Sequence, residues 1–248
     1  SGFSELAETW SKPVLARMMV QVGNEPQLKD VLVFGAGDDL AKDEADYSKR
    51  VADKQGRDVY IVDALSGALL WSIKQDVSSD TLKHSVVGDI RVLDVDRNGS
   101  LDRLYFADTG GDVWRVDMDM DTRDTDTSLY DYGDARLTKL AELGAGSVQN
   151  NISPRMFFSE PDAAMQIYKG KPTLTVALGS GYRMHPLNTG IQDRFYVLKD
   201  DYPLEPRPLT APVLKEGAGL VPHATLAGAS FLDDADKKGW YLPLGLNG

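Results

Sequence analysis

Three segments of the chain repeat one order of short apolar runs and glycine- or aspartate-containing turns, and this recurrence constrains the fold more than any other feature. Aligned on their turns, the repeats span residues 8–75, 84–144 and 150–200. Each repeat holds three or four runs rich in Val, Tyr, Phe and Trp, which is typical of antiparallel hairpins. Four strands per repeat is the layout of one propeller blade, so the sequence predicts an all-β fold of the β-propeller type.

The number of repeats is too small for a closed ring, because natural propellers have about four to eight blades. We therefore expect residues 1–248 to form a single propeller region, with about three blades and insertions, that is part of a larger propeller. Residues 201–238 are rich in proline and show no clear alternation, whereas residues 239–244 alternate again. We interpret residues 201–248 as an irregular insertion that leads into a further blade.

One turn of the second repeat, from Asp94 to Asp102, reads Asp-Val-Asp-Arg-Asn-Gly-Ser-Leu-Asp. Oxygen-bearing side chains two residues apart on a tight loop can point to one centre, and Ca²⁺ takes about six to eight oxygen ligands. Gly99 allows the positive φ of a sharp turn, after which the carbonyl of Ser100 can face the ion. The sequence therefore predicts a calcium site. The expected ligands are Asp94, Asp96, Asn98, Ser100 and Asp102.

Other interpretations of this turn remain open. The loop has Tyr105 at the place where an EF-hand carries its last glutamate, and it leads into a strand, so a shorter nine-residue variant describes it better. A hairpin turn rich in Asp, Asn and Gly that binds nothing has the same composition. Magnesium is less suited to the loop, because it keeps its waters and demands near-octahedral geometry.

Charge and composition restrict the partners of the protein. Acidic residues outnumber basic ones by 38 to 27, and the net charge of −11 repels nucleic acids and anionic lipid surfaces, so no nucleic-acid partner is expected. The chain has no cysteine. Its longest apolar runs are far shorter than the roughly 20 residues of a membrane-spanning helix, so no membrane span is expected. Residues 1–10 lack a signal-peptide pattern, and any targeting segment is expected outside this sequence.

No catalytic constellation is visible in the sequence. His84, His185 and His223 share no metal-ligand spacing, and none lies near a serine in a nucleophile-elbow context. A carboxylate pair for glycoside hydrolysis could form only in three dimensions, and the sequence neither supports nor excludes it. We expect a protein that is not an enzyme.

Four stretches carry a resemblance to a known family. They are Glu8–Arg17, Val33–Asp38, Val59–Ala64 and Gly88–Val116. Together they resemble the PilY/PilC family of type IV pilus proteins, over most of residues 8–200. The resemblance implies a carboxy-terminal β-propeller of modified quinoprotein type, in which one blade holds a nine-residue calcium loop. It implies the same five ligands for the loop in this chain.

The resemblance also implies a function. The chain would be the calcium-binding propeller of a type IV pilus biogenesis and adhesion protein, and calcium occupancy would regulate pilus extension, retraction and twitching motility. The implied partners are minor pilins and, through the full-length protein, host or abiotic surfaces. The implied location is the cell surface, pilus tip or outer membrane, reached by secretion through the periplasm.

Two alternative functions stay open. The segment Asp63–Trp71 also resembles the repeat motif of pyrroloquinoline-quinone dehydrogenases, with a glycine turn and a tryptophan that docks between blades. Such enzymes commonly have a vicinal cysteine pair, which a chain without cysteine cannot supply. An integrin-like calcium propeller for protein recognition shares the loop motif but usually repeats it in several blades, and here it occurs once.

Overall fold

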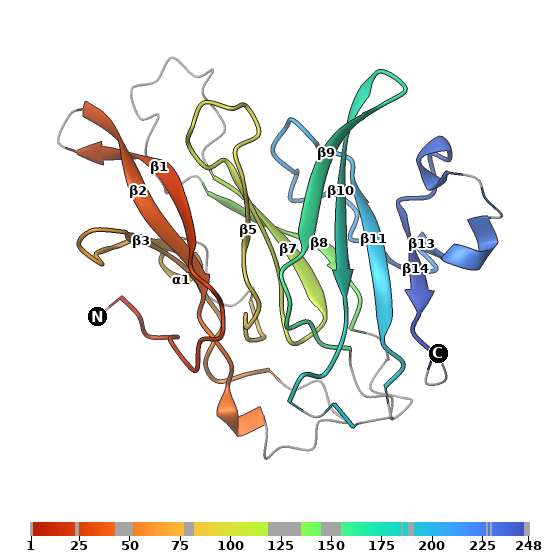
Figure 1. Cartoon of the computed structure of the whole chain (residues 1–248), viewed down its shortest axis with the longest axis horizontal. Coiled ribbons are helices and arrows are strands. Elements are labelled where there is room, and N and C mark those ends of the chain that lie inside the picture. The colour runs from red at the N-terminus through yellow and green to blue at the C-terminus, as the bar shows by residue number, and fades with distance from the viewer. Residues whose placement is uncertain are drawn as a thin grey trace.

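Strands in three sheets make up nearly all the regular structure that is described (Figure 1). The computed structural model describes residues 2–22, 25–42, 52–76, 82–118, 135–144, 155–184, 186–187, 191–226, 228 and 230–245. Helical turns in this part are α1 (Ile73–Asp76), η1 (Leu40–Lys42), η4 (His223–Leu226) and η5 (Phe231–Asp233). None of its helices is long and apolar enough to cross a membrane. The predicted all-β class is confirmed.

The first sheet is a four-stranded antiparallel meander in the order β1-β2-β3-β4. Its strands are β1 (Val14–Val22), β2 (Glu25–Gly35), β3 (Val59–Asp63) and β4 (Leu69–Ser72). A tight turn joins β3 to β4, because Oδ1 of Asp63 accepts hydrogen bonds from the N–H groups of Leu65 and Ser66. Gly67 follows with a φ of 70°, which glycine adopts without strain. The first predicted repeat, residues 8–75, thus contains four strands.

The second sheet is also a four-stranded antiparallel meander, in the order β5-β6-β7-β8. Its strands are β5 (Arg91–Leu93), β6 (Arg103–Ala107), β7 (Asp112–Asp117) and β8 (Arg136–Glu142). Oδ1 of Asp108 accepts from the N–H groups of Gly110 and Asp112 and so fixes the turn between β6 and β7. Every residue from 101 to 118 is buried, so neither face of β6 and β7 is open to solvent.

The third sheet has six strands, in the order β12-β13-β14-β11-β10-β9. They are β9 (Asp162–Tyr168), β10 (Lys171–Gly179), β11 (Arg194–Asp200), β12 (Lys215–Glu216), β13 (Gly219–Pro222) and β14 (Gly239–Pro243). The pairs β9–β10, β10–β11 and β11–β14 are antiparallel. The short strands β12 and β13 extend this sheet by parallel pairing. Four antiparallel strands with a parallel extension therefore form the third unit.

The end of the chain differs from the sequence-based expectation. Residues 239–244 were expected to lead into a further blade, but β14 pairs with β11 and completes the third sheet. Gly239 makes this pairing possible, since a Cβ atom at this position would lie 2.2 Å from the carbonyl oxygen of Val197 in β11. Only glycine lets the two backbones approach so closely. The proline-rich residues 201–238 therefore form an excursion that leaves the third sheet and returns to it.

The first strand of the third sheet also differs from the expectation. Residues 156–158 are an apolar run near the start of the third predicted repeat, 150–200, but they form no strand. The pairing partner of β10 is β9, whose sequence Asp-Ala-Ala-Met-Gln-Ile-Tyr has few residues that favour strands. Its side chains are mostly exposed, so no alternation of buried residues marks it in the sequence. Pairing with β10 determines this strand, rather than its own composition.

Two apolar clusters hold the three sheets together. Leu104 and Phe106 of β6 belong to the cluster shared with the first sheet, whereas Tyr105 and Ala107 belong to the cluster shared with the third. Successive side chains of a strand point to opposite faces, so β6 contributes to both interfaces. The first cluster includes Met18, Val33, Ile61 and Trp71, and the second includes Leu174, Val176, Tyr196 and Leu198. The second sheet is therefore the middle layer.

Charged side chains are buried where the middle sheet meets the third. Arg103 of β6 and Arg115 of β7 have no exposed surface, and both donate hydrogen bonds to Oδ1 of Asp117 at 2.6–3.0 Å. Arg115 also donates from Nη1 to Oδ2 of Asp200 in β11 at 2.7 Å. Tyr105 donates its hydroxyl to the same oxygen of Asp200, also at 2.7 Å. The two carboxylates thus link strands of both sheets.

The chain just after β11 is held by the same network. The backbone carbonyls of Tyr202, Pro203 and Glu205 accept hydrogen bonds from the two guanidinium groups. The backbone N–H of Arg207 donates to Oδ2 of Asp117 at 2.9 Å. A buried guanidinium N–H needs a partner, so these carbonyls replace the water that burial removes. The network therefore fixes the start of the 201–238 excursion against the middle sheet.

Replacing Arg115 with leucine tests the energetic weight of this network. We expect Arg115→Leu to lower the free energy of unfolding by roughly 3 kcal/mol or more, because Asp200 then keeps, among the described residues, only Arg207, 3.8 Å away, as a cationic partner. Chemical denaturation followed by tryptophan fluorescence measures the loss. Arg136→Leu is the control, since Arg136 is exposed on β8, and it should change stability by less than about 0.5 kcal/mol. Equal losses in both variants would contradict the assignment.

Asp58 is a further buried carboxylate, at the start of β3. Its Oδ1 accepts from the N–H groups of Val59 at 2.9 Å and Lys74 at 3.2 Å, and the residue is 1% exposed. Burial raises the pKa of Asp58 to about 6, against the lowering effect of these hydrogen bonds. The fold therefore favours the protonated carboxyl. The stability that this proton contributes is present below pH ~4 and is lost as the pH rises through about 6.

Asp58→Asn should remove this pH dependence, because asparagine keeps an acceptor oxygen and carries no charge. Between pH ~4 and ~7 we expect the free energy of unfolding of the parent to fall by roughly 2–3 kcal/mol relative to the variant. Urea denaturation at a series of pH values measures this difference. Asp63→Asn is the control, since hydrogen bonds from Ser66 and Lys29 hold the pKa of Asp63 below its usual value, and its titration therefore adds no pH dependence between pH ~4 and ~7. The same pH trend in both variants would show that the explanation is wrong.

Candidate metal site

The predicted calcium loop connects β5 to β6 in the middle sheet. The hairpin closes on a backbone hydrogen bond, in which the N–H of Asp102 donates to the carbonyl of Leu93 at 2.9 Å. Most of the loop's first half is exposed, whereas its last three residues, Ser100 to Asp102, are buried. The loop therefore presents polar side chains to solvent on a base that is fixed in the core.

Three carboxylates converge in this loop. Asp94, Asp96 and Asp102 each offer an oxygen atom, and these oxygens all lie within 4.8 Å of one another. Among the described residues, no other group of three or more acidic or histidine side chains meets at such a distance. Carboxylates this close repel each other unless a cation or a proton lies between them. The structure thus brings together three of the five predicted ligands as a group that could hold a metal ion.

Backbone hydrogen bonds orient the two exposed carboxylates. Asp94 accepts from the N–H of Asn98 at 3.1 Å through one oxygen and from the N–H of Gly99 at 2.9 Å through the other. Asp96 accepts from the N–H of Asn98 at 2.9 Å. Gly99 has the positive φ that the sequence predicts, 89°, and Arg97 also has one, 64°. These two left-handed residues wind the loop tightly enough for residues two apart to face one centre.

Asp102 differs from the other two carboxylates because it is buried. Its Oδ2 accepts from the N–H groups of Val95 at 2.5 Å and Asp96 at 3.2 Å. Burial raises the pKa of Asp102 to about 6, and the negative charges of Asp96 and Asp94 add to this effect. A divalent cation among the three carboxylates would favour their charged forms instead. A positive charge at this site would therefore reduce the repulsion among the three carboxylates.

The side chains of Asn98 and Ser100, the other two predicted ligand residues, are hydrogen-bonded to the backbone. Oδ1 of Asn98 accepts from the N–H of Ser100 at 2.7 Å, and Nδ2 donates to Asp96 at 3.0 Å, so the amide lies beside the carboxylates and is hydrogen-bonded within the loop. Oγ of Ser100 accepts from the N–H of Met19 in β1 at 3.1 Å. The hydroxyl of Ser100 is thus used to contact the first sheet, and its backbone carbonyl remains the expected ligand.

The donor set suits a hard divalent cation. Carboxylate, amide and carbonyl oxygens are the ligands of Ca²⁺ and Mg²⁺, and softer metals prefer nitrogen or sulfur. The contact from Ser100 to β1 was not foreseen from the sequence, because no motif marks which strand edge a loop will approach. The position of Leu101, an apolar residue inside a polar loop, is the one signal that could have indicated a buried base.

The histidines do not form a site in the described part of the chain. His84 is buried with Nδ1 4.0 Å from Asp53, and His223 packs edge-on against Trp240. His185 lies outside the described residues. The two described histidines therefore lie in separate surroundings, and neither joins the carboxylates of the loop.

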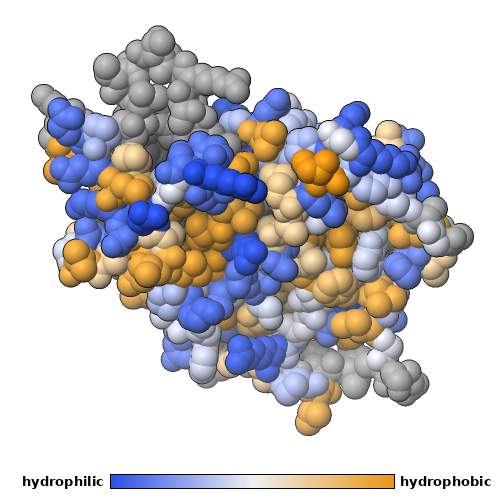
Figure 2. All heavy atoms as spheres, turned by 45° about the horizontal axis from the view of Figure 1, so that its top comes forward, coloured by the Kyte–Doolittle hydropathy of each residue, from blue (hydrophilic) through white to orange (hydrophobic). Residues whose placement is uncertain are grey.

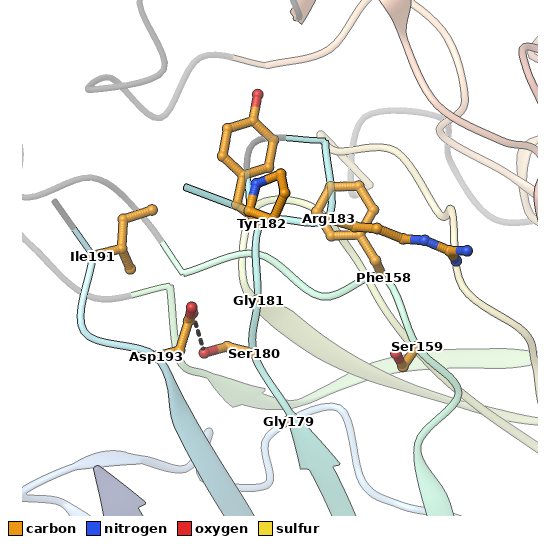
Figure 3. Close-up of a pocket in the computed structure, with 10 residues that line it drawn as sticks. Phe158, Ser159, Gly179, Ser180, Gly181, Tyr182, Arg183, Ile191 and Asp193 are labelled. Carbon is orange, nitrogen blue, oxygen red and sulfur yellow. Dashed lines mark hydrogen bonds between the residues drawn. The ribbon is translucent and has the colours of Figure 1, made fainter. Parts of the chain in front are cut away.

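A cavity of about 440 Å³ lies where β10 ends and β11 begins (Figure 3). Tyr182 and Phe158 line one side of it, and their rings are stacked with the centroids 6.0 Å apart. Oγ of Ser180 donates to Asp193 at 2.7 Å and accepts from the N–H of Arg194 at 2.9 Å. Both contacts hold the start of β11 against the end of β10. We assign the serine–aspartate pair a structural role, since no imidazole lines this cavity in the described part of the chain.

Comparisons with known proteins show a similarity in fold. No family model matches the sequence, and no curated protein matches it. Among solved structures, the C-terminal domain of PilY1 from Pseudomonas aeruginosa is similar, with a TM-score of 0.61 and 16% sequence identity. The match covers 98% of this chain and 52% of that one, so the chain spans about half the length of the solved domain. The predicted resemblance to the PilY/PilC family is confirmed at the level of the fold, which this chain shares with the PilY1 C-terminal domain.

Proposed function

We propose that the chain is a calcium-binding part of a β-propeller in a type IV pilus biogenesis and adhesion protein, with a role that is not enzymatic. The observation that carries the proposal is the convergence of Asp94, Asp96 and Asp102 in the β5–β6 loop. The spacing of the nine-residue loop and its all-oxygen donor set favour calcium over softer metals. The fold shared with the PilY1 C-terminal domain supports the connection with type IV pili.

The three sheets are proposed to be successive blades of a larger propeller. Each has a core of four antiparallel strands, and the first two run in chain order from one edge to the other. The third sheet carries exposed apolar side chains, including Phe195 on β11 and Leu242 on β14, which are paired in register. An exposed apolar sheet face favours a further covering layer. We propose that more blades of a longer protein cover it.

Calcium is proposed to act as a regulator at the loop. An ion that binds only the ordered loop stabilises it by RT ln(1 + [L]/Kd), so free calcium at about 100 times Kd adds about 2.7 kcal/mol. This stabilisation is large enough to shift a local equilibrium between an ordered and a loosened loop. We propose that calcium occupancy regulates pilus extension against retraction, and through them twitching motility.

The proposed location follows from the same context. A pilus-associated protein would pass through the periplasm and act at the pilus tip, the cell surface or the outer membrane. Its proposed partners are minor pilins and, through the full-length protein, host or abiotic surfaces. The net charge of −11 argues against nucleic acid as a partner.

Calorimetric titration of calcium into metal-stripped protein tests the site. We expect saturable binding at one site, and we expect Asp96→Ala to weaken it by at least about tenfold, because one of three converging carboxylates is lost. Asp236→Ala removes the same charge from an exposed position near η5 and should bind calcium like the parent. Magnesium serves as the competitor. If the parent binds no calcium, residues 94–102 are an acidic turn.

A test in cells addresses regulation separately. In the native bacterium, we expect an Asp96→Ala strain to show altered piliation and reduced twitching, because pilus retraction would no longer respond to calcium at this loop. Twitching zones and pilus counts at high and low calcium measure the effect, with an Asp236→Ala strain as the matched control. Normal piliation and twitching in the Asp96→Ala strain would remove the regulatory claim and leave the metal site standing.

A further inference from the structure

The metal loop does more than bridge two strands of its own sheet, because its buried end also contacts the first sheet. The N–H of Met19 in β1 donates to Oγ of Ser100 at 3.1 Å. The N–H of Leu101 donates to the carbonyl of Arg17 in β1 at 2.8 Å. Figure 1 shows the loop above β5 beside the hairpin of β1 and β2. Two consecutive residues of the loop thus bind one neighbouring strand.

These two bonds lie on the edge of β1 that faces away from β2. β1 is an outer strand of its sheet, and β2 is its only neighbour in the sheet order. In an antiparallel pair, alternate residues point both backbone groups away from the partner strand. Arg17 and Met19 are two residues apart and use those outward groups for the loop. Ser100 and Leu101 therefore cover part of the outer edge of β1.

The apolar core supports the same contact. Leu101 is 5% exposed and belongs to the cluster that contains Met18 and Val20 of β1. A Cβ atom on Gly99 would lie 3.7 Å from Nη2 of Arg17, so the guanidinium is next to the loop as well. The base of the metal site is therefore part of the interface between the first and middle sheets.

We infer that ion binding by the 94–102 loop orders the outer edge of β1, so that occupancy of the site sets how firmly the first two sheets are joined there. The inference rests on the proposed calcium site and adds a structural readout to it. Ser100 has both roles, since its carbonyl is an expected ligand and its hydroxyl holds Met19. An ion that draws the carbonyl inward fixes the residue from which the hydroxyl reaches β1.

Without an ion, the same contacts are weakened. The three carboxylates lie within 4.8 Å of one another and repel, which favours a looser loop. A looser loop moves Ser100 relative to β1, because only Leu101 is anchored by apolar packing. The β1–β2 hairpin also carries exposed apolar side chains, which are Leu15, Val22 and Leu28. Figure 2 shows hydrophobic residues gathered on one face between hydrophilic ones. The conformational order of β1 therefore determines how firmly these exposed side chains are held in position.

Amide exchange measured residue by residue by NMR tests the inference on the 248-residue chain. With calcium, we expect exchange at Met19 and Leu101 to slow by roughly 3- to 10-fold, which is the range one stabilised hydrogen bond gives. Ser100→Ala keeps the carbonyl and removes the hydroxyl. Measured at a calcium concentration that saturates it, as calorimetry determines, this variant should lose the protection at Met19, because the N–H of Met19 no longer has the hydroxyl as its acceptor.

Ser11→Ala is the matched control. Oγ of Ser11 accepts from the N–H of Gly35 in β2 at 3.1 Å, so this buried serine makes the same kind of bond to the same sheet, away from the loop. The control should keep both calcium binding and the calcium-dependent protection of Met19. Calcium that binds the parent without slowing exchange at Met19 would overturn the inference and leave the proposed site intact. Protection that persists in Ser100→Ala would also overturn it. Calorimetry without calcium binding would remove the proposed site and this inference together.

Discussion

The burial of the middle sheet on both faces is the constraint on which the rest of the structure depends. β6 and β7 contribute side chains to two apolar interfaces, so water cannot serve as the hydrogen-bond partner of their polar residues. Arg115 donates a hydrogen bond to Asp200 across the interface with the third sheet, so each buried charge has a partner of opposite sign. Burial and the charge of Asp200 raise the pKa of Tyr105 well above its usual value, so its hydroxyl stays a donor to that carboxylate. Polar groups in such a layer are stable only as a connected set.

The same constraint explains where a metal loop can lie. A cluster of three carboxylates cannot be placed within the buried strands, but it can be placed where β5 turns into β6 and the chain reaches solvent. The loop then has an exposed half, which carries two of the three carboxylates, and a buried half that belongs to the core. Asp102 joins the two halves, since it is buried and still faces Asp94 and Asp96. A change in charge at the loop is thus transmitted to residues that pack between sheets.

The sequence predicts those parts of the fold that depend on local patterns. β3, β6, β7, β10 and β11 are runs of Val, Leu, Tyr or Phe bounded by Asp or Gly, and their own composition is sufficient to identify them. β9 has few residues that favour strands and forms by pairing with the next strand, β10, whereas β14 pairs with β11 across the 201–238 excursion, so neither strand is marked by its own composition or neighbours. In the site, spacing alone predicts that Asp94, Asp96 and Asp102 converge. The orientation of Ser100 depends on Met19, 81 residues earlier, and no local pattern contains that contact.

The position of β14 within the third sheet has a mechanical consequence. β14 is an interior strand, hydrogen-bonded on one side to β11 and on the other to β13. A pulling force applied to the chain just after Pro243 would therefore act on two hydrogen-bonded ladders, whereas an edge strand could be peeled from one. Its ladder to β11 is antiparallel and its ladder to β13 is parallel, so the hydrogen bonds of the two differ in spacing and slant. Release of β14 from the third sheet therefore requires both ladders to break.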